Sequence, residues 1–592
     1  MSILLPDIPE AECTPLVRQL LEIIHLQQER IYQLEDQVRL QRERIYQLED
    51  QVRIQRERIR QLEDEIARLK GLKTRPRIAP SVLETPPRLP RDPHAKRPGS
   101  AKRSKTAELT ITEETVIPLP NPPQEAVFKG YEDFVVQDLT IEPRVILYRR
   151  ERWMTADGRN LVAPLPPEVI AGSHFGPKLI CSILHQYHHQ HVTQPLLLEQ
   201  LRQIGIDISA GELNRILTEE KDVFHQEKDE LLPTALAVSS YVQVDDTGAR
   251  HRGHNGTCTQ IGNEFFAFFA STESKSRLNF LEILREPHTD YVINERAVAY
   301  WQRQKLPQAM VSRLQEGRSV FADLAAWQAH LRDLAITGER HVRIATEGAL
   351  LGSLIAHGVS PELVILSDGA EQYDVLMHAA CWIHAERSLA RLIPCDEEHR
   401  EAIARVRREI WELYQDLKAY RQDPRPARRP RLEARFDVMC DRRPGFPDID
   451  GVLKGLRAHR SALLRVLERP EIPLHTNLSE NHLRDYVKKR KISGSTRSEL
   501  GRRARDTFAS LKKTCRELGV NFWAYLQDRV RGLGQIPRLA VLIRRKAEEA
   551  AARKASAAQL VQACGGAAGS TPRRSMRVTS APLLRAMVAR GY

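Results

Sequence analysis

The sequence predicts a mostly α-helical chain of several domains with an α/β core in its second half. Three observations predict this class: heptad repeats near the N-terminus, a basic Pro-rich stretch after them, and strand-like segments that alternate with helical ones from residue 236 on. With 592 residues the chain exceeds the ~250–300 at which single cores stop growing. Several domains are therefore expected.

The charge of the chain favours a polyanionic partner. Lys and Arg number 90 against 77 Asp and Glu, a net charge of +13. Each contact between a cationic side chain and a phosphate releases condensed counterions, so such an excess suits nucleic acid. The alternative is a basic but well-solvated surface.

Cysteine usage and hydropathy exclude other classes. The eight Cys are scattered without a C-x-x-C pair, which argues against a disulfide framework and a thiolate zinc finger. The N-terminus lacks a basic-then-apolar signal, and no apolar run approaches the ~18 residues of a membrane span. We expect a soluble, intracellular protein with no membrane partner.

Residues 1–71 predict a coiled-coil dimerisation segment. Residues 37–50 and 51–64 differ at two positions, and 23–36 is a looser third copy. Every residue at the first set of heptad core positions is Ile or Val, and the second set alternates Leu with Gln over most of its length. β-Branched residues at one set and Leu at the other favour a parallel two-stranded coiled coil, while the Gln residues fix its register. A homodimer or higher oligomer follows.

Residues 72–125 are basic and Pro-rich and predict a flexible linker. The next segment, 126–235, predicts a small strand pair between 127 and about 155, followed by helices. A helix, a turn at Gly205 and a second helix capped by Ser209 suggest a helix-turn-helix that binds DNA, although ordinary helical packing gives the same pattern. Four histidines predict a solvated helical face in preference to a metal site: His185, His188, His189 and His191.

The segment 236–530 predicts the α/β catalytic core. Strand-like runs lie at 241–246, 264–271 and 362–368, and helical insertions are expected at about 286–361 and 396–472, the second broken by a basic Pro-rich stretch at 425–435. Residues 531–592 predict a C-terminal helix and a flexible tail that begins at about 545.

Three acids stand out in this core. Asp245, beside Asp246, and Asp368 each end an apolar strand, where a carboxylate is held rigidly yet open to solvent. Two such carboxylates side by side repel each other, and a divalent cation removes that cost. The third is Glu480, in a helix expected to start at Asn477 or Ser479; it shares one helical face with Arg484 and Lys488.

Four ordered motifs carry a resemblance to a known family. VDDTG, LSDGAEQY, CWIHAER and TNLSENHLR together resemble the insertion-sequence-66 family of DDE transposases. HFGPKLICSIL and GVNFWAYLQD add similarity on either side of them. The resemblance covers roughly residues 125–285 and 360–530.

The resemblance implies a ribonuclease-H-like mixed sheet with helical insertions, and a transposase that cleaves and joins the strands of an insertion sequence. Asp245, Asp368 and Glu480 would be both the catalytic and the metal-binding residues. Two Mg²⁺ (or Mn²⁺) ions per active site would activate the attacking oxygen and stabilise the leaving one. The partners would be the element's DNA ends, target DNA and small accessory proteins of the same element, in the bacterial cytoplasm at the nucleoid.

The chain also departs from the family pattern. Asp246 stands where Glu is usual, and Asn481 replaces the Arg that normally follows the third acid. The family's Cys-rich zinc finger is absent, since residues 72–180 contain no Cys. The stretch 286–361, which lies between the first two acids, is longer than is usual in the family. Cys381 and His384 have a spacing that could suit a metal, but without a second pair they are interpreted as packing and hydrogen-bonding residues.

The densest basic stretch follows Glu480. Residues 484–516 hold twelve Lys or Arg and three acids, with few aromatic residues among them, so contact with the DNA backbone is expected more than base stacking. The residues predicted to bind DNA are Arg484, Lys488, Lys489, Arg490, Lys491, Arg497, Arg502 and Arg503.

Two other functions remain open at this point. One is a non-catalytic DNA-binding protein derived from a decayed transposase, which would bind DNA with a steep salt dependence and no need for metal. The other is a different ribonuclease-H-like nuclease acting on RNA or branched DNA.

Overall fold

The computed structural model describes residues 109–565, apart from 122, 124, 167, 168 and 171, together with isolated positions between 14 and 41; the side chains of 554 and 557–565 are outside this description. The chain divides into two compact units, Met1–Ser81 and Val82–Tyr592. In the first unit the described positions from 15 to 41 are helical, as the heptads predict. The rest of the predicted coiled coil lies outside the described residues, and its pairing with a second chain stays a prediction.

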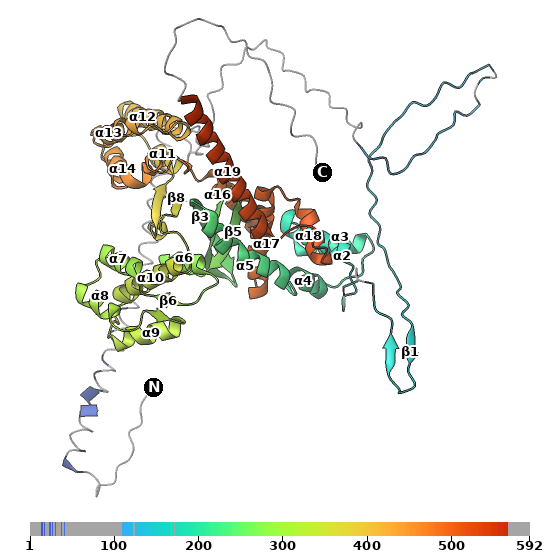
Figure 1. Cartoon of the computed structure of the whole chain (residues 1–592), viewed down its shortest axis with the longest axis horizontal. Helices are drawn as coiled ribbons and strands as arrows, with labels where there is room; N and C mark the ends of the chain where they lie inside the picture. Colours follow the sequence, from blue (N-terminus) through green and yellow to red (C-terminus); the bar gives the residue numbers. More distant parts are fainter. Residues whose placement is uncertain are drawn as a thin grey trace. The chain divides into compact units, whose positions relative to one another are not determined.

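The second unit is built around a five-stranded mixed sheet in the order β5-β4-β3-β8-β9 (Figure 1). Strand β4 pairs antiparallel with both β3 and β5, whereas β8 pairs in parallel with both β3 and β9. Their bounds are β3 Tyr241–His251, β4 His254–Asn263, β5 Phe266–Thr272, β8 Val364–Ser367 and β9 Met377–Ala380. The predicted α/β core is confirmed, although β4 and β9 were not predicted.

Both faces of the sheet are covered. Alternate residues of β5 point to opposite faces: Phe266 and Phe268 belong to the main core shared with helices α5, α6 and α10, while Ala267 and Phe269 pack with Tyr486 of α16. The covering helices are α5 Asp222–Val238, α6 Arg277–Arg285, α10 Glu339–Ala356 and α16 Asn477–Ser493.

Helix α17 (Glu499–Leu518) lies along the outer edge of β5 and satisfies its free amides. Three side chains spaced four residues apart, Asp506, Ser510 and Thr514, accept hydrogen bonds from alternate β5 backbone N–H groups, at 2.8, 2.9 and 3.1 Å. An edge strand treated in this way cannot pair with another chain. This edge of the sheet is closed.

Before the sheet, residues 126–151 are extended but unpaired, and the strand pair lies further on, in β1 (Arg152–Met154) and β2 (Asn160–Val162). The predicted strand pair is thus present, but only its first strand lies between 127 and 155. The alternation before that strand does not reflect a buried face, since Phe134 and Val145 are 90% and 94% exposed. The helices that follow are α2 Pro177–Leu184, the π-helix η3 His185–His189, α3 Gln194–Gln203 and α4 Ala210–Thr218.

The two predicted helices and the turn between them are present as α3 and α4. Gly205 adopts a φ of +86° in the turn, and the Ser209 hydroxyl accepts the backbone N–H of Glu212 as an N-cap. The charge of this motif is unlike that of a DNA reader, since residues 194–220 hold five acids and two basic residues. Its role in DNA binding stays a prediction.

The first inserted block, 286–361, is mainly helical as predicted, with one short ribbon of β6 and β7 that was not expected (Figure 1). Trp301 and Trp327 are fully buried in its centre. Its elements are β6 Tyr291–Val292, α7 Glu295–Arg303, α8 Gln308–Gln315, β7 Val320–Phe321, α9 Leu324–Asp333 and α10.

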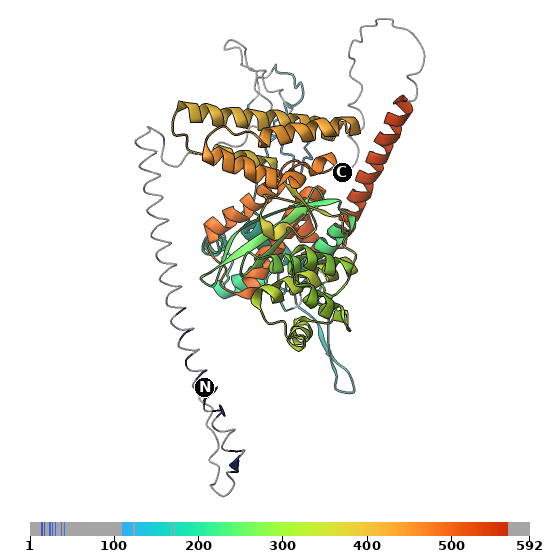
Figure 2. The ribbon, with the colours of Figure 1, turned by 90° about the vertical axis from the view of Figure 1, so that its left-hand side faces the viewer.

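The second inserted block forms a separate helical layer with its own core (Figure 2). The predicted break at 425–435 is limited to a turn, since α13 already begins at Arg429 with a proline in its first turn. The block, with the helix before it, comprises α11 Trp382–Ala390, α12 Glu397–Gln422, η5 Pro426–Arg428, α13 Arg429–Cys440, α14 Pro447–Ala458, α15 Arg460–Leu463 and η6 Arg465–Leu467.

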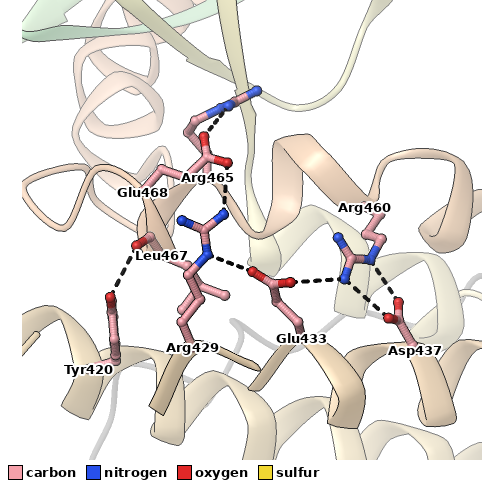
Figure 3. Close-up of polar contacts among 8 residues, drawn as sticks. All are labelled: Tyr420, Arg429, Glu433, Asp437, Arg460, Arg465, Leu467 and Glu468. Atoms are coloured by element: carbon pink, nitrogen blue, oxygen red, sulfur yellow. Dashed lines mark hydrogen bonds and ion pairs between the residues drawn. The ribbon is translucent and has the colours of Figure 1, made fainter. Parts of the chain in front are cut away.

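A chain of ion pairs fastens α13 to the segment that leads towards α16 (Figure 3). Glu433 accepts from Arg429 at 2.6 Å and lies 3.4 Å from Arg460, which also contacts Asp437 at 2.7 Å. Arg429 continues the chain to Glu468 at 3.1 Å. These pairs are partly exposed, so each one adds little alone, but together they fix the end of the block from which α16 starts.

After α16 and α17 the chain forms α18 (Phe522–Arg531) and α19 (Leu539–Gly565). The tail was predicted to lose order at about 545, and this is wrong for residues up to 565, because the Ala-, Glu- and Arg-rich sequence there is a strong helix former. Among the described residues, none of the helices has the length and apolar character needed to cross a membrane.

Candidate active site

Asp245 and Asp368 lie on neighbouring parallel strands. In the pairing of β3 with β8, Tyr241 stands opposite Val364 and Gln243 opposite Leu366. The same register, carried two residues further, brings Asp245 level with Asp368 on strands ~4.8 Å apart. The two acids predicted at strand ends therefore meet, although β3 itself continues to His251 and only β8 ends there.

Glu480 reaches the site from the first turn of α16, which begins at Asn477 as predicted. Its neighbour Ser479 is anchored to the sheet: the backbone N–H donates to Gln243 Oε1 at 3.4 Å and the hydroxyl donates to Gln260. Gln260 pairs with Asp245 across β3 and β4. The helix start is thus fastened to the residues that flank Asp245.

The acids perturb one another. Burial raises the pKa of Asp245 to about 7, and the charges of Asp368, Asp246 and Glu480 act in the same direction. A hydrogen bond of 2.8 Å from the backbone N–H of Asp246 opposes the shift. Asp245 is consequently an acid whose negative charge the surrounding protein leaves largely uncompensated.

Two side chains of helix α11 lie beside Glu480. Arg387 donates to Glu480 Oε1 at 3.0 Å, and His384 Nε2 lies 3.9 Å from the same oxygen. Arg484, one turn along α16, lies 3.7 Å from the other oxygen. Burial lowers the pKa of His384. Cys381 is buried at the start of α11, in keeping with the packing role predicted for it.

Asp246 joins three segments of the chain. Its Oδ2 accepts from the Tyr373 hydroxyl, lies 2.8 Å from Lys275 Nζ and 3.4 Å from Gln372 Nε2. Burial and the Asp246 charge raise the pKa of Tyr373. Sequence reasoning noted the tyrosine of LSDGAEQY only as part of a motif and missed Lys275. The contacts hold the segment after Asp368 against the strand of Asp245.

The three acids suit a hard divalent cation by their chemistry, since carboxylate oxygens are the ligands that Mg²⁺ and Mn²⁺ prefer. The uncompensated charge of Asp245 supports the same fit. In the described part of the chain, however, no group of three His, Cys, Asp or Glu side chains is gathered closely enough to enclose a metal. Because Glu480 is paired with Arg387, the three acids do not enclose a metal position in this arrangement.

Most of the predicted DNA-binding residues lie at the surface. Arg484, Lys488, Lys491, Arg497 and Arg503 are exposed. Two others are half-buried and engaged within the protein: Arg490 donates to Thr247 Oγ1 at 3.1 Å, and Arg502 lies 2.7 Å from Glu499.

The prediction for Lys489 is wrong. It is 6% exposed, and its ammonium group lies 3.4 Å from the centre of the Tyr187 ring and donates to the Tyr187 carbonyl at 2.8 Å. Burial lowers its pKa to about 7, and the charges of Arg505 and Lys512 add to this. Lys489 faces the core because it continues the buried side of α16 after Tyr486.

The four histidines do not form one solvated face. His188 is buried and stacks on Phe508 with the ring centres 4.0 Å apart. His191 lies 3.0 Å from Asp485, which is also 2.5 Å from Lys512 and 3.6 Å from Lys513. His189 is exposed, and His185 and His191 are half-buried. The π-helical turn of η3 packs against α17 through these rings.

Comparisons with known proteins agree with these motifs. The model of the family described as "Transposase IS66 family" matches residues 354–504, which include Asp368 and Glu480. An uncharacterized protein of Sinorhizobium fredii, y4jO, is 42% identical over 322 residues, which are 54% of this chain and 100% of that protein. No solved structure matches the chain. The chain belongs to the IS66 family of transposases.

Proposed function

We propose that this protein cleaves the DNA ends of its insertion sequence and joins them to a target, with Asp245, Asp368 and Glu480 as the catalytic acids. The observation that carries the proposal is the shared level of Asp245 and Asp368 on adjacent strands, with Glu480 close enough to affect the pKa of Asp245. A ribonuclease-H-like fold is part of this proposal. The sheet order and the antiparallel direction of β4 support it.

The same three residues would hold Mg²⁺ or Mn²⁺, which would supply Lewis-acid stabilisation of the oxygens at the reacting phosphate. The chain's own part is to orient the acids. Ser479 fixes the start of α16 on Gln243 and Gln260, and Asp246 holds the loop after Asp368 through Tyr373. Glu480 would have to leave Arg387 to join the other acids.

DNA would lie over the exposed cations of α16 and the start of α17: Arg484, Lys488, Lys491, Arg497 and Arg503, with Arg490 and Arg502 beneath them. Lys489 has no part in this surface. A homodimer formed by the coiled coil, small accessory proteins and a place at the bacterial nucleoid complete the proposal.

A strand-transfer assay tests it. Purified protein, Mg²⁺ or Mn²⁺ and DNA carrying the flanking ends of the element should give joined products, and Asp245→Asn, Asp368→Asn and Glu480→Gln should each reduce them by at least ~10³-fold, the scale of losing a charge essential to the transition state. Glu371→Gln, an exposed acid near Asp368, is the matched control and should stay active.

All variants should keep their affinity for DNA. Joined products that persist in the three variants would contradict the proposal. Metal-independent DNA binding without any joining by the wild type would favour the second candidate, a non-catalytic DNA-binding protein derived from a transposase.

A further inference from the structure

We infer that the tip of the β3–β4 hairpin is a second contact surface for the duplex DNA bound at the acidic site. This inference rests on the proposed function, because it assigns a further surface to the same DNA. From Val244 on, β3 no longer pairs with β8 but continues in its pairing with β4, so the hairpin extends past the end of β8 (Figure 2). Its tip carries Arg250, Arg252 and His254, all exposed.

The hairpin tip is joined to a distant basic segment. Residues 494–497, which connect α16 with α17, run beside it: the backbone N–H of Arg252 donates to the Thr496 carbonyl at 2.8 Å, and that of Thr496 donates to the Arg250 carbonyl at 3.0 Å. His251 fills the junction, 2.8 Å from Thr496 Oγ1 and 2.7 Å from Glu499. The two segments therefore form one continuous surface.

The charge of this surface is predominantly positive, and Glu499 at its junction is paired with His251 and Arg502. Residues 248–256 and 488–498 contain no acidic residue. Together they expose Arg250, Arg252 and His254 from the hairpin and Lys488, Lys491 and Arg497 from the other segment. The arginines of the hairpin lie about 240 positions before the basic run after Glu480 that the sequence singles out, and only the fold unites them. A surface of predominantly positive charge fits the phosphate backbone of a duplex.

The position of the hairpin tip determines which part of the bound duplex it would contact. His251, the last residue of β3, lies six positions after Asp245. At ~3.3 Å per residue this is about 20 Å, which corresponds to roughly six base pairs at ~3.4 Å each. Arg490, which contacts Thr247 between these points, holds α16 along the hairpin. A duplex whose cleaved phosphate lies at Asp245 can reach the tip without bending.

The test measures the salt dependence of DNA binding by the full-length protein, with a 30-base-pair duplex as the probe and no divalent cation present. Arg250→Ala combined with Arg252→Ala should make the slope of log K against log salt shallower by about 1.8, since each lost phosphate contact removes ~0.9. The control replaces Arg296 and Arg332, two exposed arginines of the first inserted block, by Ala. It should leave the slope unchanged.

A wild-type slope in the hairpin variant would overturn the inference, and so would an equal change in the control. If the wild type itself does not bind the duplex, the proposed function fails, which is a separate outcome. If the wild type joins strands but the hairpin variant binds with a wild-type slope, only the hairpin assignment falls.

Discussion

Asp245 and Asp485 are both partly buried acids close to helix α16, yet their surroundings are opposite. Around Asp245 the neighbours are acids, and burial together with their charges raises its pKa to about 7. Around Asp485 the neighbours are Lys512, Lys513 and His191, and their contacts hold its pKa far below the usual range despite burial. The protein neutralises one acid internally and leaves the charge of the other uncompensated, and we propose that an external cation binds there. Whether nearby cations compensate the charge of an acid thus distinguishes a structural cluster from a candidate catalytic one.

The largest effect on stability is expected at Asp485, the acid that is neutralised within the protein. Asp485→Ala leaves Lys512 and Lys513, 7% and 8% exposed, without their counter-charge. Breaking such a buried pair should lower the free energy of unfolding by about 3–5 kcal/mol. Asp245→Asn removes a repelled charge and should leave metal-free stability unchanged or higher. Denaturant titration of both variants compares them, and equal destabilisation would remove the contrast.

The second prediction concerns pH. The folded protein lowers the pKa of Lys489 to about 7, whereas the unfolded chain keeps the proton up to about 10.5. Between these values the unfolded state binds more protons, so this group's contribution to stability increases as pH rises from 7 towards 10.

Lys489→Met removes that contribution. Relative to wild type, the variant should gain stability at pH 6, and this gain should shrink by up to ~1.4 kcal/mol per pH unit above pH 7. Unfolding free energies measured at pH 6, 7.5 and 9 check it. Lys488→Met, one position earlier and exposed, is the control and should keep the wild-type profile. The same profile in both variants would mean that Lys489 is solvated.

A smaller effect on stability is expected at Glu480, an acid of the candidate site that is paired with a cation. Arg387 is the nearest cation to Glu480, at 3.0 Å. Arg387→Ala should lower the free energy of unfolding in the absence of metal by about 1–2 kcal/mol, the scale of a hydrogen bond between charged groups. This loss should become smaller when Mn²⁺ is added. Arg391→Ala, one turn further along and exposed, should have no effect. An unchanged stability in Arg387→Ala would show that the pair of Arg387 and Glu480 does not stabilise the fold.

Sequence alone singled out the two aspartates that the fold brings level on β3 and β8. Asp245 and Asp368 follow apolar runs of buried strands, and such runs are readable because they must be continuous when both faces are covered. Strand β4 escaped notice because HNGTCTQIGN is largely polar, with two glycines, and β9 because MHAA has only four residues. Their places are set by pairing with distant strands, which no local pattern encodes.

The helix-borne half of the site was harder to read. The run KKRK after Tyr486 looks uniformly basic, but helical periodicity places Lys489 on the buried side with Leu483 and Tyr486. His188 was misread for the same reason, since its burial depends on Phe508, over 300 positions away. The pairing of Glu480 with Arg387 and the anchoring of Ser479 on Gln260 likewise join residues far apart in the chain.

The most direct test of the account is the response of thermal unfolding to Mn²⁺. If the acids around Asp245 are left open for a divalent cation, rising Mn²⁺ should raise the melting temperature of the wild type progressively, as binding to the folded state alone requires. The variants Asp245→Asn and Asp368→Asn should start at an equal or higher melting temperature and respond little. An equal Mn²⁺ response in all three proteins would contradict the account.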